Sequence, residues 1–501
     1  MFEQKHQRIA PVLGLVGFIC MALVCSGQGF EEKHLDKEAI FLEYSATIKV
    51  NEDWSFRREV YKKLKILKEE ARSMGEVPIP YDKENDKITE ISAYTITPDG
   101  KRHKYTKTSD VSLYPSYPFY SNIMVKMITM PEVNVGSVIE YKVVIESKGM
   151  PIKNAYWKDF YFTPSIPIKL MKTTVILPKK LNIQYKESNL TYKPKITQDN
   201  AAITYAWEIH DAYDDRKPEE YIRPPQIGDV PEVVEFSSIK SWKDVSDWYY
   251  ALVQKNLKIT PDIEAATQKA ISGKVALKDK ARAILEYIQD NFRYVSMSLG
   301  EYSLEPHLTD EVFKNKYGDC KDLSLLCVAM LKAAGIGSNV ALFRDEFSIT
   351  DPQYDLPITT LFDHVIVLVN DEKGKSFYVD PQLKGYDIGE YPLYYQNAYT
   401  FVITQDGGKF GRLPIFAEER SYTKQEIKTV INPDGSALNE ITSLWPLDTS
   451  IETREQMKSL DNTQKEDFYQ RLNAMLADGG EVLERRWENF DNRYGLIKSY
   501  V

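Results

Sequence analysis

Residues 323–334 (LSLLCVAMLKAA) are apolar around almost the whole circumference of a helix, so such a helix has to be buried at the centre of a domain. Its start is polar. Asp319 is a favourable N-cap residue, and Asp322 stands where a carboxylate can return a hydrogen bond to the cap. Gly335 follows the last apolar residue and suits the left-handed C′ position. The sequence therefore predicts a central helix with defined ends, and Cys320 lies in its first turn.

The position of Cys320 makes it a candidate nucleophile. Unpaired backbone N–H groups and the positive end of the helix dipole stabilise a thiolate in the first turn of a helix. Cys327 lies further along the apolar helix and is interpreted as an inert core residue. Two helical positions separated in this way are about 10 Å apart, whereas a disulfide needs Cα atoms within about 7 Å. We therefore expect both thiols to be free.

A thiolate needs a base, and His364 is the best-placed histidine. It opens an apolar strand, residues 364–369 (HVIVLV), where an imidazole has to find polar partners. A turn at residues 371–374 (DEKG) leads to a second short strand that ends at Asp380, so the two strands should pair as a hairpin. Asp380 can then hold one ring nitrogen while the other faces Cys320. Cys320, His364 and Asp380 are the predicted catalytic residues.

Zinc is an alternative use of Cys320, Cys327, His364 and Asp380. The two cysteines lack the short spacer of structural zinc sites, and a helix would aim Cys327 inward. We therefore expect neither a metal nor another cofactor.

The region before this site predicts an antiparallel β-sandwich. Period-two alternation runs through residues 38–165, for example over residues 39–50 (AIFLEYSATIKV) and 54–67. Short strands at this spacing are typical of a sandwich, which we assign to residues 28–235. Prolines and aspartates in residues 211–235 mark its boundary.

The remaining chain predicts an α+β organisation. Helical periodicity at residues 242–257, 262–270 and 277–292 leads into the central helix, and we assign residues 236–418 to one α+β domain. A hairpin and a helix over residues 449–476 follow. Residues 419–501 are interpreted as the start of a C-terminal β domain with a helix, which the chain leaves incomplete.

Residues 1–27 have the pattern of a secretory signal. Basic residues precede the apolar stretch 9–24, and small residues allow cleavage near Gly27. The stretch is shorter than the about 20 residues of a spanning helix, so we expect removal rather than anchoring, and no membrane span afterwards. Lipidation of Cys25 is a third interpretation, disfavoured by the bulky Val24. We expect export to the periplasm or cell envelope.

Composition restricts the partners. Lys and Arg total 64 and Asp and Glu total 73 among 501 residues, which gives a net charge of -9. We find no basic stripe of the kind that neutralises phosphates, so we expect no nucleic-acid partner.

Three motifs in order resemble the bacterial branch of the transglutaminase-like superfamily: residues 318–322 (GDCKD) on a buried helix, then 363–365 (DHV) and 378–380 (YVD) on strands. The resemblance covers about residues 240–410. The preceding β region resembles the domain of unknown function that often accompanies this core in exported bacterial proteins.

The resemblance implies a papain-like mechanism on a protein or peptide substrate. Cys320 would be the nucleophile, His364 the general base and then acid, and Asp380 the residue that orients the imidazole. Attack on a glutamine carboxamide or peptide amide would leave a thioester, which an amine or water resolves. The backbone N–H of Cys320 would meet the oxyanion, and the second donor is left open between Tyr302 and His307. We do not carry over a calcium requirement.

Two other functions stay open. One is a cysteine peptidase or amidase on the same core. The other is a non-catalytic binding or assembly protein, whose β domains grip a cell-envelope polymer or partner and whose triad is vestigial. Because all three catalytic positions are filled, we favour an enzyme.

Overall fold

We describe the protein from a computed structural model. The predicted signal segment, including Gly27 and Cys25, and the candidate donor Tyr302 lie outside the described residues. The chain divides into two compact units, Met1–Pro224 with Pro231–Ser238, and Pro225–Val230 with Ile239–Val501. We describe each unit by itself. The structure describes residues 29–117, 120, 122–214, 232–296, 304–344, 351–371, 374–415, 420–476 and 481–501, without the side chains of 472–476.

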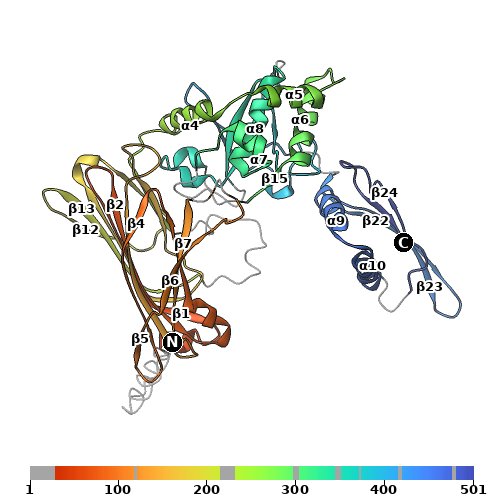
Figure 1. Cartoon of the computed structure of the whole chain (residues 1–501). Coiled ribbons are helices and arrows are strands. Elements are labelled where there is room, and N and C mark those ends of the chain that lie inside the picture. The colour runs from red at the N-terminus through yellow and green to blue at the C-terminus, as the bar shows by residue number, and fades with distance from the viewer. Residues whose placement is uncertain are drawn as a thin grey trace, which may run out of the picture. The chain divides into compact units, whose positions relative to one another are not determined.

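The first unit is built on an eight-stranded sheet with the strand order β12-β13-β10-β1-β2-β8-β4-β5 (Figure 1). A short helix, α2 (Phe30–Lys33), precedes the sheet. The strands are β1 (Ala39–Val50), β2 (Phe56–Ile66), β4 (Asp86–Ile96), β5 (Arg102–Lys104), β8 (Val138–Ser147), β10 (Ile168–Pro178), β12 (Lys195–Gln198) and β13 (Ala202–Ala212). The alternating segments on either side of the Asn51 turn form the β1–β2 hairpin, as predicted.

One strand pair in this sheet departs from the predicted antiparallel pattern. β1 and β10 pair in parallel, with Ile48 opposite Val175. The chain reaches β10 only after a long excursion through β2 to β9, and such a crossover is what a parallel pair requires. Local alternation gives the strands but not the partner that each one takes.

Two three-stranded sheets complete this unit, with the orders β3-β7-β6 and β11-β14-β9. One core joins the first of them to the large sheet and includes Ile66, Ile128 and Ile139. In the other, Phe236 packs against Trp207 of β13. The predicted β-rich first part of an α+β protein is confirmed. The strands are β3 (Glu76–Asp82), β6 (Lys107–Ser112), β7 (Ile123–Thr129), β9 (Trp157–Tyr161), β11 (Gln184–Ser188) and β14 (Val233–Ser237).

The second unit centres on helix α8 (Cys320–Ala333), which packs on β17 and β18 of a five-stranded sheet. Helices α5, α6 and α7 contact α8 as well. Its residues from Cys320 to Leu331 are buried, so the predicted central helix is confirmed. The helices that precede α8 in this unit are α4 (Trp242–Asn256), α5 (Pro261–Ala270), α6 (Leu277–Asn291) and α7 (Thr309–Asn315), and the first three confirm the predicted helical segments.

The strand order of this sheet is β19-β18-β17-β20-β21. A short parallel pair, β15 with β16, leads directly into α8. The strands are β15 (Arg293–Tyr294), β16 (Tyr317–Gly318), β17 (Ser338–Arg344), β18 (His364–Val369), β19 (Phe377–Val379), β20 (Tyr399–Val402) and β21 (Lys409–Arg412).

The end of the second unit is a four-stranded sheet, β22-β23-β25-β24, with two helices. We call residues 420–501 the C-terminal segment. The single helix predicted over residues 449–476 is wrong, because the chain breaks at Asp461, whose carboxylate accepts the backbone N–H of Gln464 and starts a new helix. The elements are β22 (Lys424–Ile431), β23 (Ala437–Leu444), α9 (Leu447–Ser459), α10 (Asn462–Leu476), β24 (Arg486–Glu488) and β25 (Lys498–Tyr500).

Within the described residues, we find no helix with the length and apolar character needed to cross a bilayer.

Candidate active site

The start of α8 is fixed by a reciprocal cap. The carboxylate of Asp319 accepts the backbone N–H groups of Lys321 and Asp322 at 3.1 and 3.2 Å, and Asp322 accepts that of Asp319 at 3.3 Å. This confirms the predicted capping box. A Cβ atom at Gly318 would lie 2.7 Å from the Cβ of Asp322, so only glycine allows this approach. The cap leaves Cys320 in the first turn, 1% exposed.

Buried charges surround this cap. The ammonium group of Lys321, which is 2% exposed, contacts the carboxylate of Asp319. The Nδ1 atom of His307 lies 3.1 Å from Asp322, whose Oδ1 also accepts the backbone N–H of His307 at 2.8 Å. Burial opposes charge on Asp322, but Lys321 and His307 lower its pKa. Burial likewise opposes charge on His307, and Asp322 raises its pKa. His307, which the sequence offered as an oxyanion donor, is therefore held by Asp322.

His364 and Asp380 lie at the same end of one hairpin. β18 and β19 pair antiparallel, with Val367 opposite Val379, which confirms the predicted hairpin. His364 is the first residue of β18, and Asp380 follows the last residue of β19. The Nε2 atom of His364 is 2.9 Å from Oδ2 of Asp380, and Asp380 is 4% exposed.

The side chain of Cys320 acts on the same imidazole and is one of the groups that raise its pKa. The three predicted residues thus meet in one place. Burial favours neutral His364, but the charge and hydrogen bond of Asp380, with the contribution of Cys320, raise its pKa to about 10. The imidazolium form is therefore favoured at neutral pH. The rings of Phe343 and Tyr395 stand edge-on to it and fix its plane.

Two groups beside Cys320 were not predicted. The side chain of Gln382 donates from Nε2 to the carbonyl oxygen of Cys320 at 3.4 Å, and its backbone N–H donates to Oδ1 of Asp380 at 2.9 Å. Tyr294 is the other, because burial and the nearby Cys320 raise its pKa to about 12. The turn after Asp380 and the β15–β16 pair place these side chains. Both depend on long-range contacts, so no local motif signalled them.

Cys327 has the opposite character to Cys320. It lies fully inside the helix packing, and burial raises its pKa to about 12. It therefore remains a protonated thiol at neutral pH, as expected of a core residue. Both described cysteines are free. Over the part of the chain that the structure describes, no three His, Cys, Asp or Glu side chains form a group suited to a metal ion.

A cysteine at the start of a buried helix, together with a histidine that a carboxylate binds, is the arrangement used by the class of papain-like thiol enzymes. The comparisons agree with this class. Residues 264–346 match the Transglutaminase-like superfamily, a range that includes Cys320 and ends before His364. Residues 25–214 match DUF3857, a domain of unknown function with a solved structure. The chain therefore contains a transglutaminase-like core after a DUF3857 domain, as the resemblance predicted.

A solved structure shares this fold. A putative protease from Parabacteroides distasonis is 18% identical with a TM-score of 0.62, and the match covers 75% of this chain and 72% of that chain. An M1 zinc metallopeptidase from Deinococcus radiodurans (11% identity, 40% and 42% covered, TM-score 0.22) and a putative cysteine protease from Cytophaga hutchinsonii (11%, 66% and 76%, 0.20) superpose too poorly to support an argument. A comparison with curated proteins finds no match.

Proposed function

We propose that this protein is an exported cysteine enzyme that transfers or hydrolyses acyl groups at amide bonds of proteins or peptides. Cys320, His364 and Asp380 are its catalytic residues. The observation that carries the proposal is the position of His364, whose Nε2 atom lies 2.9 Å from Oδ2 of Asp380 and whose pKa is raised by Asp380 together with Cys320. A histidine with such a raised pKa is protonated at neutral pH, so it holds a proton for the leaving nitrogen beside a sulfur nucleophile.

In the proposed mechanism, the thiolate of Cys320 attacks the amide carbonyl carbon. The backbone N–H of Cys320, at the start of α8, donates to the resulting oxyanion. His364 gives its proton to the nitrogen as the C–N bond breaks, which releases ammonia or an amine and leaves a thioester. Water or a second amine then attacks the thioester, His364 takes a proton from it, and the C–S bond breaks, which releases the product and restores the thiolate. Asp380 keeps the imidazole oriented throughout.

The N-terminal pattern of residues 1–27 supports export, with the periplasm or cell envelope as the site of action. The likeness in fold to a protein described as a protease supports a peptide substrate.

The test compares the wild-type protein with Cys320→Ala and the matched control Cys327→Ala. Each is given glutamine-containing peptides, with and without a fluorescent primary amine. Mass spectrometry follows the acyl-enzyme, the hydrolysed peptide and the amine adduct. We expect an acyl mass on Cys320 and turnover in wild type and Cys327→Ala, with both lost in Cys320→Ala. Full turnover by Cys320→Ala would remove this residue from the mechanism, and an inert wild type would favour the binding protein with a vestigial triad.

A further inference from the structure

An unbroken series of hydrogen bonds joins the C-terminal segment to the turn after Asp380. Arg493, between β24 and β25, donates from Nη2 to Oε1 of Gln289 at 2.6 Å. Gln289 donates from Nε2 to the carbonyl oxygen of Leu383 at 2.8 Å. The backbone N–H of Leu383 donates to the carbonyl oxygen of Asp380 at 3.3 Å. The series therefore ends on the backbone of the residue that orients His364.

Gln289 is the fixed centre of this series. It lies on α6 and is 2% exposed, and both ends of its amide are used. Arg493 is itself fixed, because its Nη1 contacts both carboxylate oxygens of Asp290 at 3.0 and 3.1 Å. A buried amide that is hydrogen-bonded at both ends keeps its position better than an exposed ion pair does, because water does not compete for its hydrogen bonds.

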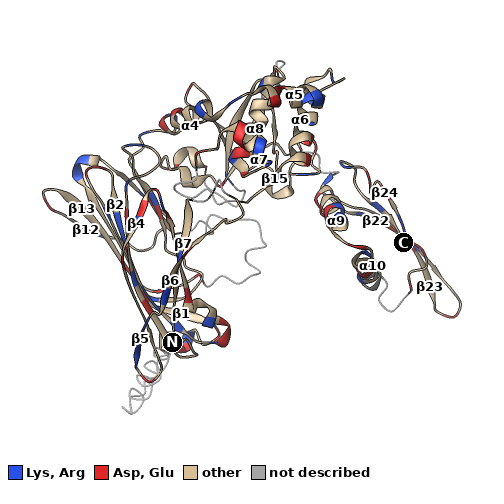
Figure 2. Cartoon of the chain, viewed as in Figure 1, with Lys and Arg blue, Asp and Glu red and all other residues tan. Residues whose placement is uncertain are grey.

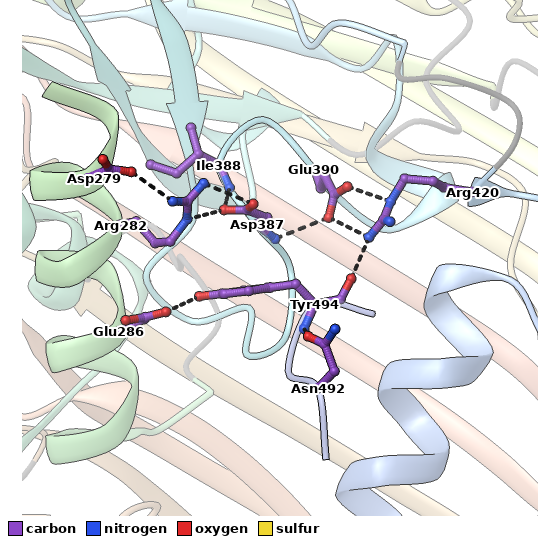
Figure 3. A network of polar contacts seen from close by, with 9 residues as sticks. All are labelled: Asp279, Arg282, Glu286, Asp387, Ile388, Glu390, Arg420, Asn492 and Tyr494. Atoms are coloured by element: carbon purple, nitrogen blue, oxygen red, sulfur yellow. Dashed lines mark hydrogen bonds and ion pairs between the residues drawn. The ribbon is translucent and has the colours of Figure 1, made fainter. Parts of the chain in front are cut away.

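The far end of the same loop is held by the same segment (Figure 3). Arg282 of α6 binds Asp387 with two hydrogen bonds of 2.7 and 3.0 Å. Arg420 donates to Glu390 at 3.1 Å and to the carbonyl oxygen of Tyr494 at 2.8 Å. Residues 380–390 are thus held at both ends, and the C-terminal segment contributes to each attachment.

We propose that Arg493 and Gln289 are positioning residues, through which the C-terminal segment sets the 380–383 turn. This proposal rests on the proposed function. The turn carries the two contacts that organise the site, since Gln382 donates its backbone N–H to Asp380 and its side-chain amide to the carbonyl of Cys320. A shift of this turn lengthens both contacts together and moves Asp380 relative to His364. Misplacement of about 1 Å is enough to lower a rate roughly a hundredfold.

The experiment compares full-length Gln289→Leu and Arg493→Ala with the control Tyr494→Phe. The control removes a contact made by the neighbour of Arg493 in the C-terminal segment, the 2.5 Å hydrogen bond from the Tyr494 hydroxyl to Glu286, and leaves the series to Leu383 intact. One readout is the rate at which a peptide ester acylates Cys320. The other is the titration of His364, followed by NMR. The ionisable groups that act on the ring of His364 include Asp380 and Cys320.

We expect the acylation rate to fall roughly tenfold or more in Gln289→Leu and Arg493→Ala. In both, the pKa of His364 should fall toward its ordinary value of 6.5. Tyr494→Phe should match wild type in both readouts, and Arg493→Lys, which keeps the charge opposite Asp290, should recover part of the loss. Circular dichroism checks folding. If Gln289→Leu does not fold, the comparison of Arg493→Ala with Arg493→Lys tests the proposal.

Two results would overturn the proposal. In the first, folded Arg493→Ala keeps the wild-type titration of His364. In the second, Tyr494→Phe loses as much as Arg493→Ala, which shows general loosening instead of positioning. Failure of the proposed function gives a different result. Even if the wild-type protein has no turnover, the pKa of His364 would still differ between wild type and Arg493→Ala.

Discussion

At the scale of single residues, the site separates two cysteines that share one helix. Cys320 helps to raise the pKa of the His364 imidazole to about 10, whereas burial raises the pKa of the Cys327 thiol to about 12. The difference arises from position alone. Cys320 lies in the first turn of α8, at the positive end of the helix dipole, and Cys327 lies two turns deeper in an apolar environment.

This difference predicts selective alkylation. In the folded protein at pH 7.5, iodoacetamide should modify Cys320 far faster than Cys327, because the thiolate is the reacting form. Peptide mapping after timed quenching measures both rates, and labelling of both cysteines in urea serves as the control. Equal rates in the folded state would contradict an activated Cys320.

The pair of His364 and Asp380 predicts a pH-dependent stability. The pKa of His364 is raised from 6.5 to about 10 in the folded protein, so the pair stabilises fully below about pH 6.5 and loses this effect as the pH rises through 10. Asp380→Asn should therefore lower the free energy of unfolding by about 1.5–3 kcal/mol at pH 6 and by much less at pH 10. Urea titration followed by exposure of Cys327 measures both values. A larger loss at pH 10 would contradict this assignment.

At the scale of elements, the local sequence pattern predicted helix ends and a hairpin, because neighbouring residues determine these features. Asp319 and Gly335 gave the ends of α8, and the DEKG turn gave the hairpin that brings His364 to Asp380. Long-range partners were not predictable in this way. The parallel pairing of β1 with β10 and the contact of Gln382 with Cys320 depend on segments far apart in sequence. Lys321 shows the same limit, because its burial comes from tertiary packing even though the anion that it contacts, Asp319, is a neighbour in sequence.

The close approach at the start of α8 predicts the effect of a methyl group. Gly318→Ala places a Cβ atom 2.7 Å from that of Asp322, so the capping box has to shift. We expect a loss of about 1–3 kcal/mol in stability and slower alkylation of Cys320. Gly337→Ala, near the other end of α8, meets its nearest neighbour at 3.7 Å and is the matched control. Thermal melting and alkylation rates measure both, and equal behaviour of the two variants would contradict the steric argument.

At the scale of the whole molecule, the chain divides into two compact units, and each contains buried apolar clusters of its own. Charges of both signs are interspersed along the described strands and helices (Figure 2), and many face one another, as Lys142 does between Glu59 and Glu90. Such exposed pairs contribute little to stability. The buried apolar residues of each core, including Ile128 in the first unit and Leu326 in the second, therefore determine how each unit unfolds.

Because the buried residues of the two units are different, a cavity in one unit should destabilise mainly that unit. Ile128→Ala should destabilise the first unit by about 2–5 kcal/mol and leave alkylation of Cys320 unchanged. Leu326→Ala, in α8, should destabilise the second unit by a similar amount and expose Cys327 earlier in urea. Calorimetry of the full chain resolves the two transitions. A single transition that both variants lower equally would show that the units unfold together.

The isolation of the Cys320 sulfur has a chemical consequence in an oxidising compartment. Peroxide would convert this thiolate to a sulfenic acid, which normally escapes further oxidation by condensing with a second thiol. Cys327 cannot serve, because it is buried two turns along the same rigid helix. Among the described residues no other thiol is present, so an oxidised Cys320 depends on a thiol from another source for its recovery.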